Sequence, residues 1–139
     1  MLVIKKEQTE KLRLDLYSSF IDRVINHLWK RYPEKLVYLS QGEIKDKITR
    51  YIELAQNYSL EYEQDIASYI EFTFYMGELF ENKPENFMAL EILNNNFLDG
   101  TEKIESLRNF IFGISINTIQ ATNQNKFNYY ENMNNSNIL

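Results

Sequence analysis

The sequence predicts an all-α fold, a single-domain bundle of five to six helices followed by a disordered C-terminal tail. Two observations carry this prediction: apolar residues recur at helical spacing along five segments, and a capping box marks the start of one of them. No pair of strands joined by a hairpin turn is visible. We expect residues 1–121 to form the bundle and residues 122–139 to form a flexible tail, because seven of the last seventeen residues are Asn.

The first segment carries a long amphipathic stripe. Apolar residues recur there at every fourth position, at Leu12, Leu16, Phe20, Val24 and Leu28. This spacing predicts a long helix that begins between Lys5 and Thr9. The helix should end before Pro33, because the residue preceding a proline is pushed out of the helical region. Residues 34–39 are expected to add one or two further turns.

A capping box predicts the second long helix. In the segment Ser40-Gln-Gly-Glu43, the Ser40 hydroxyl can accept from the Glu43 amide while the Glu43 carboxylate accepts from the Ser40 amide. The helix is expected to end near Asn57-Tyr58. Its apolar face is predicted to consist of Ile44, Ile48, Tyr51, Ile52 and Ala55.

The most apolar part of the chain predicts a buried central helix. Residues 69–80 read YIEFTFYMGELF, which is apolar nearly all round a helix. Three acids precede this run, and their position suits the positive end of the helix dipole: Glu61, Glu63 and Asp65. Gly77 would lie inside this helix, where a glycine costs about 1 kcal/mol relative to alanine. A close approach of another helix is the usual compensation.

Two further helices are expected after residue 82. Pro84 is well placed for the first turn of a helix over residues 87–93, and Asp99-Gly100 is a turn signal. Thr101 can then cap the last helix. Its inward face is predicted to consist of Ile104, Leu107, Phe110, Ile111 and Ile114.

The composition excludes several classes of function. The 139 residues include no Cys and one His, so thiolate or multi-histidine metal sites and a cysteine nucleophile are excluded. The formal charge of −5 argues against nucleic-acid binding. No apolar run approaches the roughly 20 residues that span a bilayer, and residues 1–6 do not resemble a signal peptide. The four glycines are scattered and form no phosphate-binding loop. We therefore expect no cofactor, no metal and no membrane span.

Charge is distributed unevenly along the chain. Residues 1–50 hold 11 basic and 7 acidic side chains, whereas residues 51–99 hold 1 basic and 10 acidic. Two interpretations stand: the two halves attract each other within one fold, or the acidic stretch faces a partner. Tyrosines, which are common at interfaces, concentrate in the same acidic stretch. The predicted partner-binding residues are Tyr58, Tyr62, Glu63, Asp65, Tyr69, Tyr75 and Glu78.

Candidate catalytic groups are few. His27 is the only conventional base at neutral pH, and its position near the end of the first helix favours an interaction with the helix dipole and the last carbonyls. No serine lies in a glycine-flanked nucleophile elbow. Acidic residues offer many pairs, but nothing in their spacing selects one pair, so we interpret them as solvated helix faces.

Two ordered blocks of residues stand out along the first two thirds of the chain. The first comprises Ile4-Lys-Lys-Glu-Gln8, Leu12-Arg13, Phe20-Ile-Asp-Arg23, His27-Leu28 and Tyr32-Pro33-Glu34. The second comprises Ile52-Glu-Leu-Ala55, Tyr58-Ser-Leu60, Glu63-Gln-Asp-Ile66, Tyr69-Ile70 and Phe74-Tyr-Met-Gly77. Over about residues 2–93 this chain resembles a group of small helical bacterial proteins encoded beside type VI secretion spike and effector genes. Where that group often has Tyr-Gly-Ile, this chain has Tyr58-Ser59-Leu60.

The resemblance implies a cytoplasmic bacterial accessory protein, a chaperone-like adaptor that binds an effector or spike component without catalysis. The resemblance implies no catalytic residue in this chain. An alternative is an immunity protein that occludes the active site of a toxin, because acidic proteins can neutralise basic toxins by charge complementarity. A third hypothesis is a small toxin or hydrolase that uses carboxylates. In the first two cases the partner is a protein; the sequence does not indicate an oligomeric state.

Overall fold

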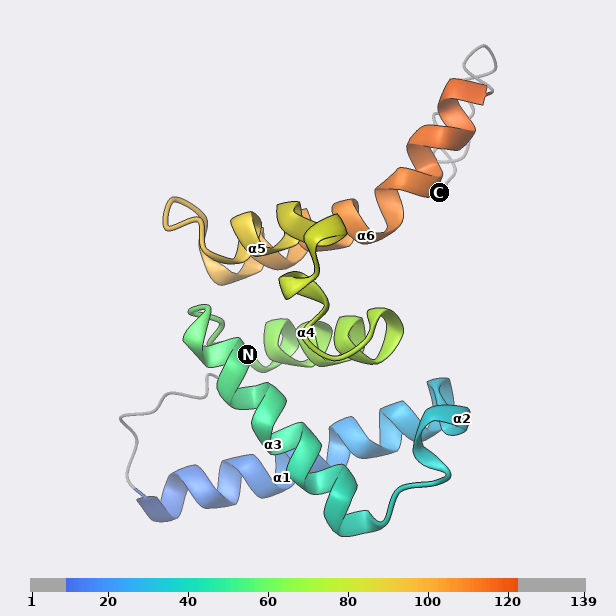
Figure 1. Ribbon diagram of the computed structural model, residues 1–139. Helices are drawn as coiled ribbons and strands as arrows, with labels where there is room; N and C mark the ends of the chain where they lie inside the picture. The colour runs from blue at the N-terminus through green and yellow to red at the C-terminus, as the bar shows by residue number, and fades with distance from the viewer. Residues whose placement is uncertain (1–9, 123–139) are drawn as a thin grey trace. The chain divides into compact units, whose positions relative to one another are not determined.

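The computed structural model in Figure 1 describes the backbone of residues 10–122 and the side chains of residues 17–113. Six α-helices and two short 3₁₀ helices lie in this range, and no strand does, which confirms the predicted all-α class. The chain divides into two compact units, residues 1–104 and residues 105–139. The predicted tail beyond Thr122 and the predicted helix start between Lys5 and Thr9 lie outside the described residues.

The helices follow the predicted order. The first four are α1 (Glu10–Arg31), α2 (Pro33–Leu36), α3 (Gln41–Asn57) and α4 (Glu63–Met76). Two 3₁₀ helices, η1 (Phe80–Asn82) and η2 (Pro84–Asn86), then lead into α5 (Phe87–Leu93) and α6 (Gly100–Thr122). Pro84 opens η2, because its missing amide and fixed φ suit the first position of a helical turn.

The first unit is built around α4. Helices α3 and α4 pack against each other, α1 packs against both, and α5 packs against η1 and η2. Figure 1 shows α4 between α1 below it and α5 above it. The apolar faces that the sequence predicts meet in this core, whose fully buried members include Leu28, Ile48, Ile52, Ile66, Ile70 and Phe80.

Capping boxes begin two of the helices. Ser40 and Glu43 exchange the two predicted side-chain-to-backbone hydrogen bonds at the start of α3. The same exchange joins Asp99 and Glu102 at the start of α6, at 2.9 and 2.8 Å. The prediction that Thr101 caps α6 is therefore wrong, because the Asp99 carboxylate accepts from the Glu102 amide instead. The Thr101 hydroxyl donates to Asp65 at 2.8 Å.

The central helix is shorter than predicted. Helix α4 ends at Met76, and Gly77 adopts φ of 109° and ψ of 153° as its C-terminal cap. A side chain is strained in this region of φ and ψ, so Gly77 ends the helix instead of allowing another helix to approach. Leu79 follows with φ of 55° and turns the chain into η1. The apolar run over residues 69–80 thus belongs to two elements joined by a turn.

Replacing Gly77 by alanine is expected to lower the free energy of unfolding by about 1–3 kcal/mol, because alanine must adopt the same φ. Gly42 is the matched control: it lies in the first turn of α3, and an added Cβ there would have no neighbour closer than 4.0 Å. Gly42→Ala should leave stability unchanged or raise it slightly. Urea unfolding of both variants checks this, and equal stability would contradict it.

The junction between α3 and α4 brings the chain close to the start of α6. Ser59 has φ of 69°, a conformation that glycine adopts at lower cost. A glycine at this position would therefore fit the backbone. A Cβ on Gly100 would lie 3.3 Å from the Ser59 carbonyl oxygen, which is tighter than an ordinary contact. The absence of a side chain at Gly100 therefore permits this approach.

The second unit contains the continuation of α6. Of the residues predicted to face inward, Leu107 is buried, while Phe110 and Ile111 are half-buried; Ile104, the last residue of the first unit, is also buried. The side chain of Ile114, also predicted to face inward, lies outside the described side chains. Phe112, between the predicted inward positions, is exposed.

Candidate functional site

The seven predicted partner-binding residues do not form one exposed face. Tyr69, Glu63 and Asp65 are buried, and Tyr58 is half-buried. The exposed members are Tyr62, Tyr75 and Glu78. The tyrosines among these three are 43% and 50% exposed, respectively, so each retains a large contact surface. The acidic, tyrosine-rich stretch is therefore divided between the interior of the fold and its surface.

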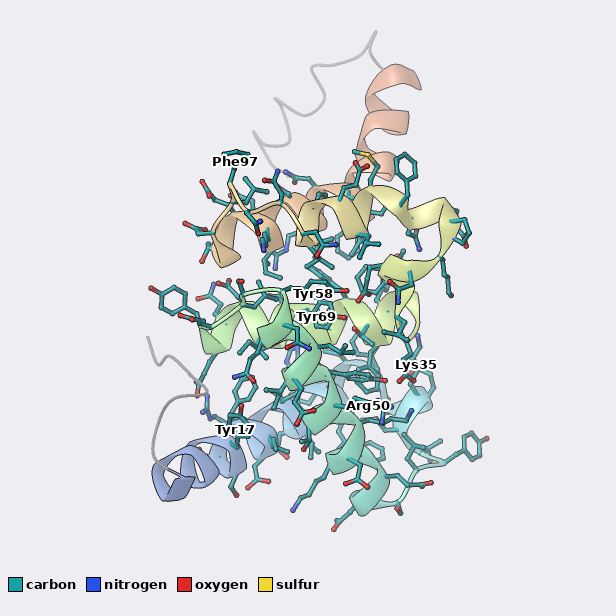
Figure 2. The ribbon with its side chains drawn as sticks, turned by 60° about the vertical axis from the view of Figure 1, so that its left-hand side comes forward. Tyr17, Lys35, Arg50, Tyr58, Tyr69 and Phe97 are labelled. Carbon is teal, nitrogen blue, oxygen red and sulfur yellow. The ribbon has the colours of Figure 1, made fainter. Side chains whose placement is uncertain are left out.

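A buried carboxylate organises the interior members. Glu81 is 1% exposed, and its Oε2 accepts from the Tyr69 hydroxyl at 2.7 Å and from the Tyr58 hydroxyl at 2.9 Å. The two tyrosines, labelled one above the other in Figure 2, have ring centroids 6.0 Å apart in an edge-to-face arrangement. Burial and the adjacent carboxylate raise the pKa of both phenols above the ordinary value. Two tyrosines of the acidic stretch thus have their hydroxyl groups hydrogen-bonded inside the fold.

A buried lysine contacts the backbone of Tyr58. Lys103 is 2% exposed, and its Nζ donates to the Tyr58 carbonyl oxygen at 2.8 Å. Burial lowers the pKa of this ammonium group, since it disfavours the charged form. Together with the bond from Thr101 to Asp65, this contact fixes the first turn of α6 against the end of α3 and the start of α4.

Opposite charges line the seam between α1 and α4. Arg23 donates through both terminal nitrogens to the two oxygens of Glu63, each at 3.1 Å. The His27 Nε2 lies 3.4 Å from Glu71 Oε1, and Arg31 lies 3.5 Å from the second oxygen of the same carboxylate. The basic residues are four apart on α1, and the acids are eight apart on α4. Each row therefore lies along one helix face, and the two faces meet.

His27 thus has a different environment from the predicted one. The sequence favours a contact with the dipole and the last carbonyls of its own helix. In the structure its imidazole reaches across to Glu71 on α4, and half of its side chain is exposed.

A second charged contact joins α3 to the turn after α4. Glu78 accepts from Arg50 at 2.7 Å and lies 3.6 Å from Lys47. The hydrogen bond from Arg50 lowers the pKa of Glu78, and its effect outweighs that of burial. Like the contacts of Glu63 and Glu71, this one joins a base of residues 1–50 to an acid of residues 51–99. These contacts support the interpretation that the two halves of the chain attract each other within one fold.

An open groove lies along the seam between α1 and α4, with a volume of about 360 Å³. Its floor consists of the apolar residues Phe20, Val24, Leu28 and Ala67. Polar groups form its rim, namely Arg23, His27, Glu63 and Gln64. Since Arg23 and Glu63 pair with each other, the groove combines an apolar floor with a rim whose main charges are already balanced.

This chain matches no protein-family model, no curated protein and no solved structure. Within the described residues, no helix is both long enough and apolar enough to cross a membrane. The described part of the chain also brings together no group of three or more His, Cys, Asp or Glu side chains that could hold a metal ion.

Sequence reasoning missed three residues that organise the site, Arg23, Glu71 and Glu81. The sequence did contain a signal for the first two. The bases at positions 23, 27 and 31 are four residues apart and the acids at positions 63 and 71 are eight apart, so each set can lie along one face of its helix and the two faces can pair. No signal distinguishes Glu81, because an acid beside Asn82 in a break between helices has the pattern of a solvated residue.

Proposed function

We propose that this chain is a non-enzymatic binding protein, and that the groove between α1 and α4 holds an apolar side chain of a protein partner. The main support for this proposal is the groove itself. Its floor is apolar, its volume suits one large side chain, and it lies between two helices of the first unit. Deep apolar anchors of this kind supply most of the binding energy of protein interfaces.

The charge of the rim favours a protein segment over a charged small molecule. A charged ligand gains most from a counter-charge that lacks a partner. Here Arg23 already makes a two-bond contact with Glu63, and Glu71 lies against both His27 and Arg31. An apolar side chain needs no counter-charge and gains from the floor alone.

Two of the predicted partner-binding residues, Tyr75 and Tyr62, flank the α4 residues of the groove along the chain. Tyr75 follows Glu71 by four residues on α4, so it continues the row that faces α1. It is half exposed and lies near Tyr32, whose pKa is raised by burial and by the Glu71 carboxylate. Tyr62 precedes the groove residue Glu63 at the start of the same helix. A partner segment along α4 would therefore meet an exposed tyrosine at each end and the groove between them.

The class of partner comes from the resemblance over residues 2–93. We propose an accessory role, in which the chain acts as a chaperone-like adaptor for an effector or a spike component of a type VI secretion system in the bacterial cytoplasm. The test is co-purification with the products of the neighbouring genes. Capture of an effector through its delivery region supports the adaptor role, whereas capture of a toxic domain with rescue of growth would assign an immunity role instead.

A pair of variants tests whether the groove is the binding site. Ala67→Trp fills the groove from α4, and Asn26→Trp adds the same bulk to an exposed position of α1 that does not line it. We expect Ala67→Trp to weaken capture of the partner at least about tenfold, while Asn26→Trp leaves it unchanged. Equal capture by both folded variants would refute the groove as the site. Toxicity on expression that a single Glu→Gln change removes would instead support a carboxylate-dependent hydrolase.

A further inference from the structure

Phe97 is the most exposed of the large apolar side chains in the described part of the chain. Its side chain is 96% exposed, on the turn between α5 and α6. The turn itself is well ordered by hydrogen bonds: the Phe97 amide donates to Asn95 Oδ1 at 2.9 Å, and the Leu98 amide donates to the Asn95 carbonyl oxygen at 3.2 Å. The turn therefore presents the exposed ring on an ordered backbone.

Hydrogen bonds hold the turn at both of its ends. The Asn94 amide donates to Leu90 at the end of α5, and the capping box of Asp99 and Glu102 begins α6. The first turn of α6 is in turn held by the contacts from Thr101 to Asp65 and from Lys103 to Tyr58. A backbone that is already ordered loses little conformational entropy on binding, so the turn offers Phe97 as an anchor at a low entropic cost to the backbone.

Acids surround Phe97, and bases of α1 that are paired with Glu63 and Glu71 but half-exposed lie along the groove. Exposed acids flank the turn, at Glu91, Asp99 and Glu102. At the groove, about half of each of the side chains of Arg23, His27 and Arg31 is exposed, and Lys30 is exposed beside them. Arg23 uses two N–H groups on Glu63, and a guanidinium carries five, so it can bind a further acid.

We propose that Phe97 of one copy of this chain inserts into the α1–α4 groove of a second copy. The floor of the groove supplies apolar contacts for the ring, and the acids of the turn meet the bases of α1. Figure 2 shows Phe97 at one end of the first unit and α1 at the other, with α4 between them. The two surfaces of a single copy are therefore too far apart to meet, and the contact forms between copies.

This contact is head-to-tail, because the two surfaces that meet are different. A pair of copies then has one free turn and one free groove, so association continues into short chains or closes into a ring. The inference rests on the same groove as the proposed function. Self-association would keep the apolar floor covered until a partner segment displaces the Phe97 ring.

Sedimentation over a range of concentrations tests the proposal. The mean mass of the wild type should rise above 16.7 kDa with concentration, and added salt should weaken association, since charged groups surround the contact. Phe97→Ala should weaken self-association at least about tenfold. Tyr38→Ala is the matched control, because Tyr38 is 92% exposed on a different turn, and it should behave as the wild type.

Mixing two defective variants makes the test specific. Ala67→Trp blocks the groove and keeps the turn, whereas Phe97→Ala keeps the groove and loses the ring. Each alone should remain monomeric, and their mixture should form a one-to-one dimer that cannot grow. Gln64→Trp, which starts from an exposed rim residue, serves as a second groove variant should Ala67→Trp misfold.

Two results would overturn the inference. The first is a mean mass that stays at 16.7 kDa up to about 1 mM protein. The second is self-association that Phe97→Ala leaves unchanged. Either result leaves the proposed function standing if Ala67→Trp still removes partner capture. Conversely, self-association through Phe97 combined with unchanged partner capture by Ala67→Trp would refute only the proposed function.

Discussion

Glu81→Ala is expected to lower the free energy of unfolding by about 3–5 kcal/mol, because it removes the shared acceptor of two buried hydrogen bonds and leaves a cavity. The hydroxyls of Tyr58 and Tyr69 would both lose their acceptor, and the 1%-exposed position would be left as a cavity. Urea unfolding followed by circular dichroism measures the effect.

Two further variants separate the hydrogen bonds from other effects. Glu81→Gln keeps one carbonyl oxygen that can accept from both phenols, so it should cost clearly less than the alanine variant. Since Glu81 Oε1 has no hydrogen-bond partner within the described residues, replacing it by an amide nitrogen breaks no further hydrogen bond. Glu85→Ala, at an exposed position in η2, should change stability by no more than about 0.5 kcal/mol. Equal losses for Glu81→Ala and Glu85→Ala would contradict the buried cluster.

Stability is expected to fall steeply above pH 10. Burial, with a smaller effect of Glu78, raises the pKa of Tyr51 to about 12, and burial also raises that of Tyr69. Because an unfolded tyrosine ionises near pH 10, the neutral phenols stabilise the fold fully below that pH, and the contribution is lost as the pH rises further. Each phenol contributes about 1.4 kcal/mol per pH unit, and burial also raises the pKa of Tyr58, so the three together lower stability by about 4 kcal/mol per unit.

Lys103 acts in the opposite direction over a lower range. Its folded pKa is depressed, so its contribution rises with pH and is complete once the unfolded lysine has also lost its proton, near pH 10.5. Urea unfolding between about pH 9 and 11 should therefore show a loss that steepens toward pH 11. Tyr51→Phe should reduce the slope, whereas Tyr38→Phe, at an exposed position, should not. A flat profile over this range would contradict the prediction.

The helices could be predicted from the sequence because their signals are local. Apolar spacing placed α1 and α3, and the capping box at Ser40 located the start of α3 correctly. The end of α4 could not be predicted in this way. Leu79 is apolar and continues the helical pattern, yet it adopts a left-handed conformation, and the buried Phe80 belongs to the next element. An apolar run alone cannot distinguish one helix from two elements that share a core.

The candidate site depended on contacts that a single sequence does not display. Five tyrosines in the acidic stretch are more phenols than a core with few polar groups can satisfy, which predicted an exposed surface. The buried carboxylate of Glu81 provides the missing acceptor for Tyr58 and Tyr69, since it accepts a hydrogen bond from both hydroxyls. Glu63 and Asp65 do begin a helix, as predicted, but their partners lie 40 and 36 residues away along the chain, on α1 and α6.

These long separations also set an order of events while the chain is being made. The bases of α1 leave the ribosome before the acids that pair with them, since Arg23 precedes Glu63 by 40 residues and His27 precedes Glu71 by 44. At about 5–20 residues per second, that delay lasts about 2–9 s. During this time the nascent N-terminal half carries its excess of positive charge without its acidic partners, so α1 can reach its final packing only after α4 has been synthesised.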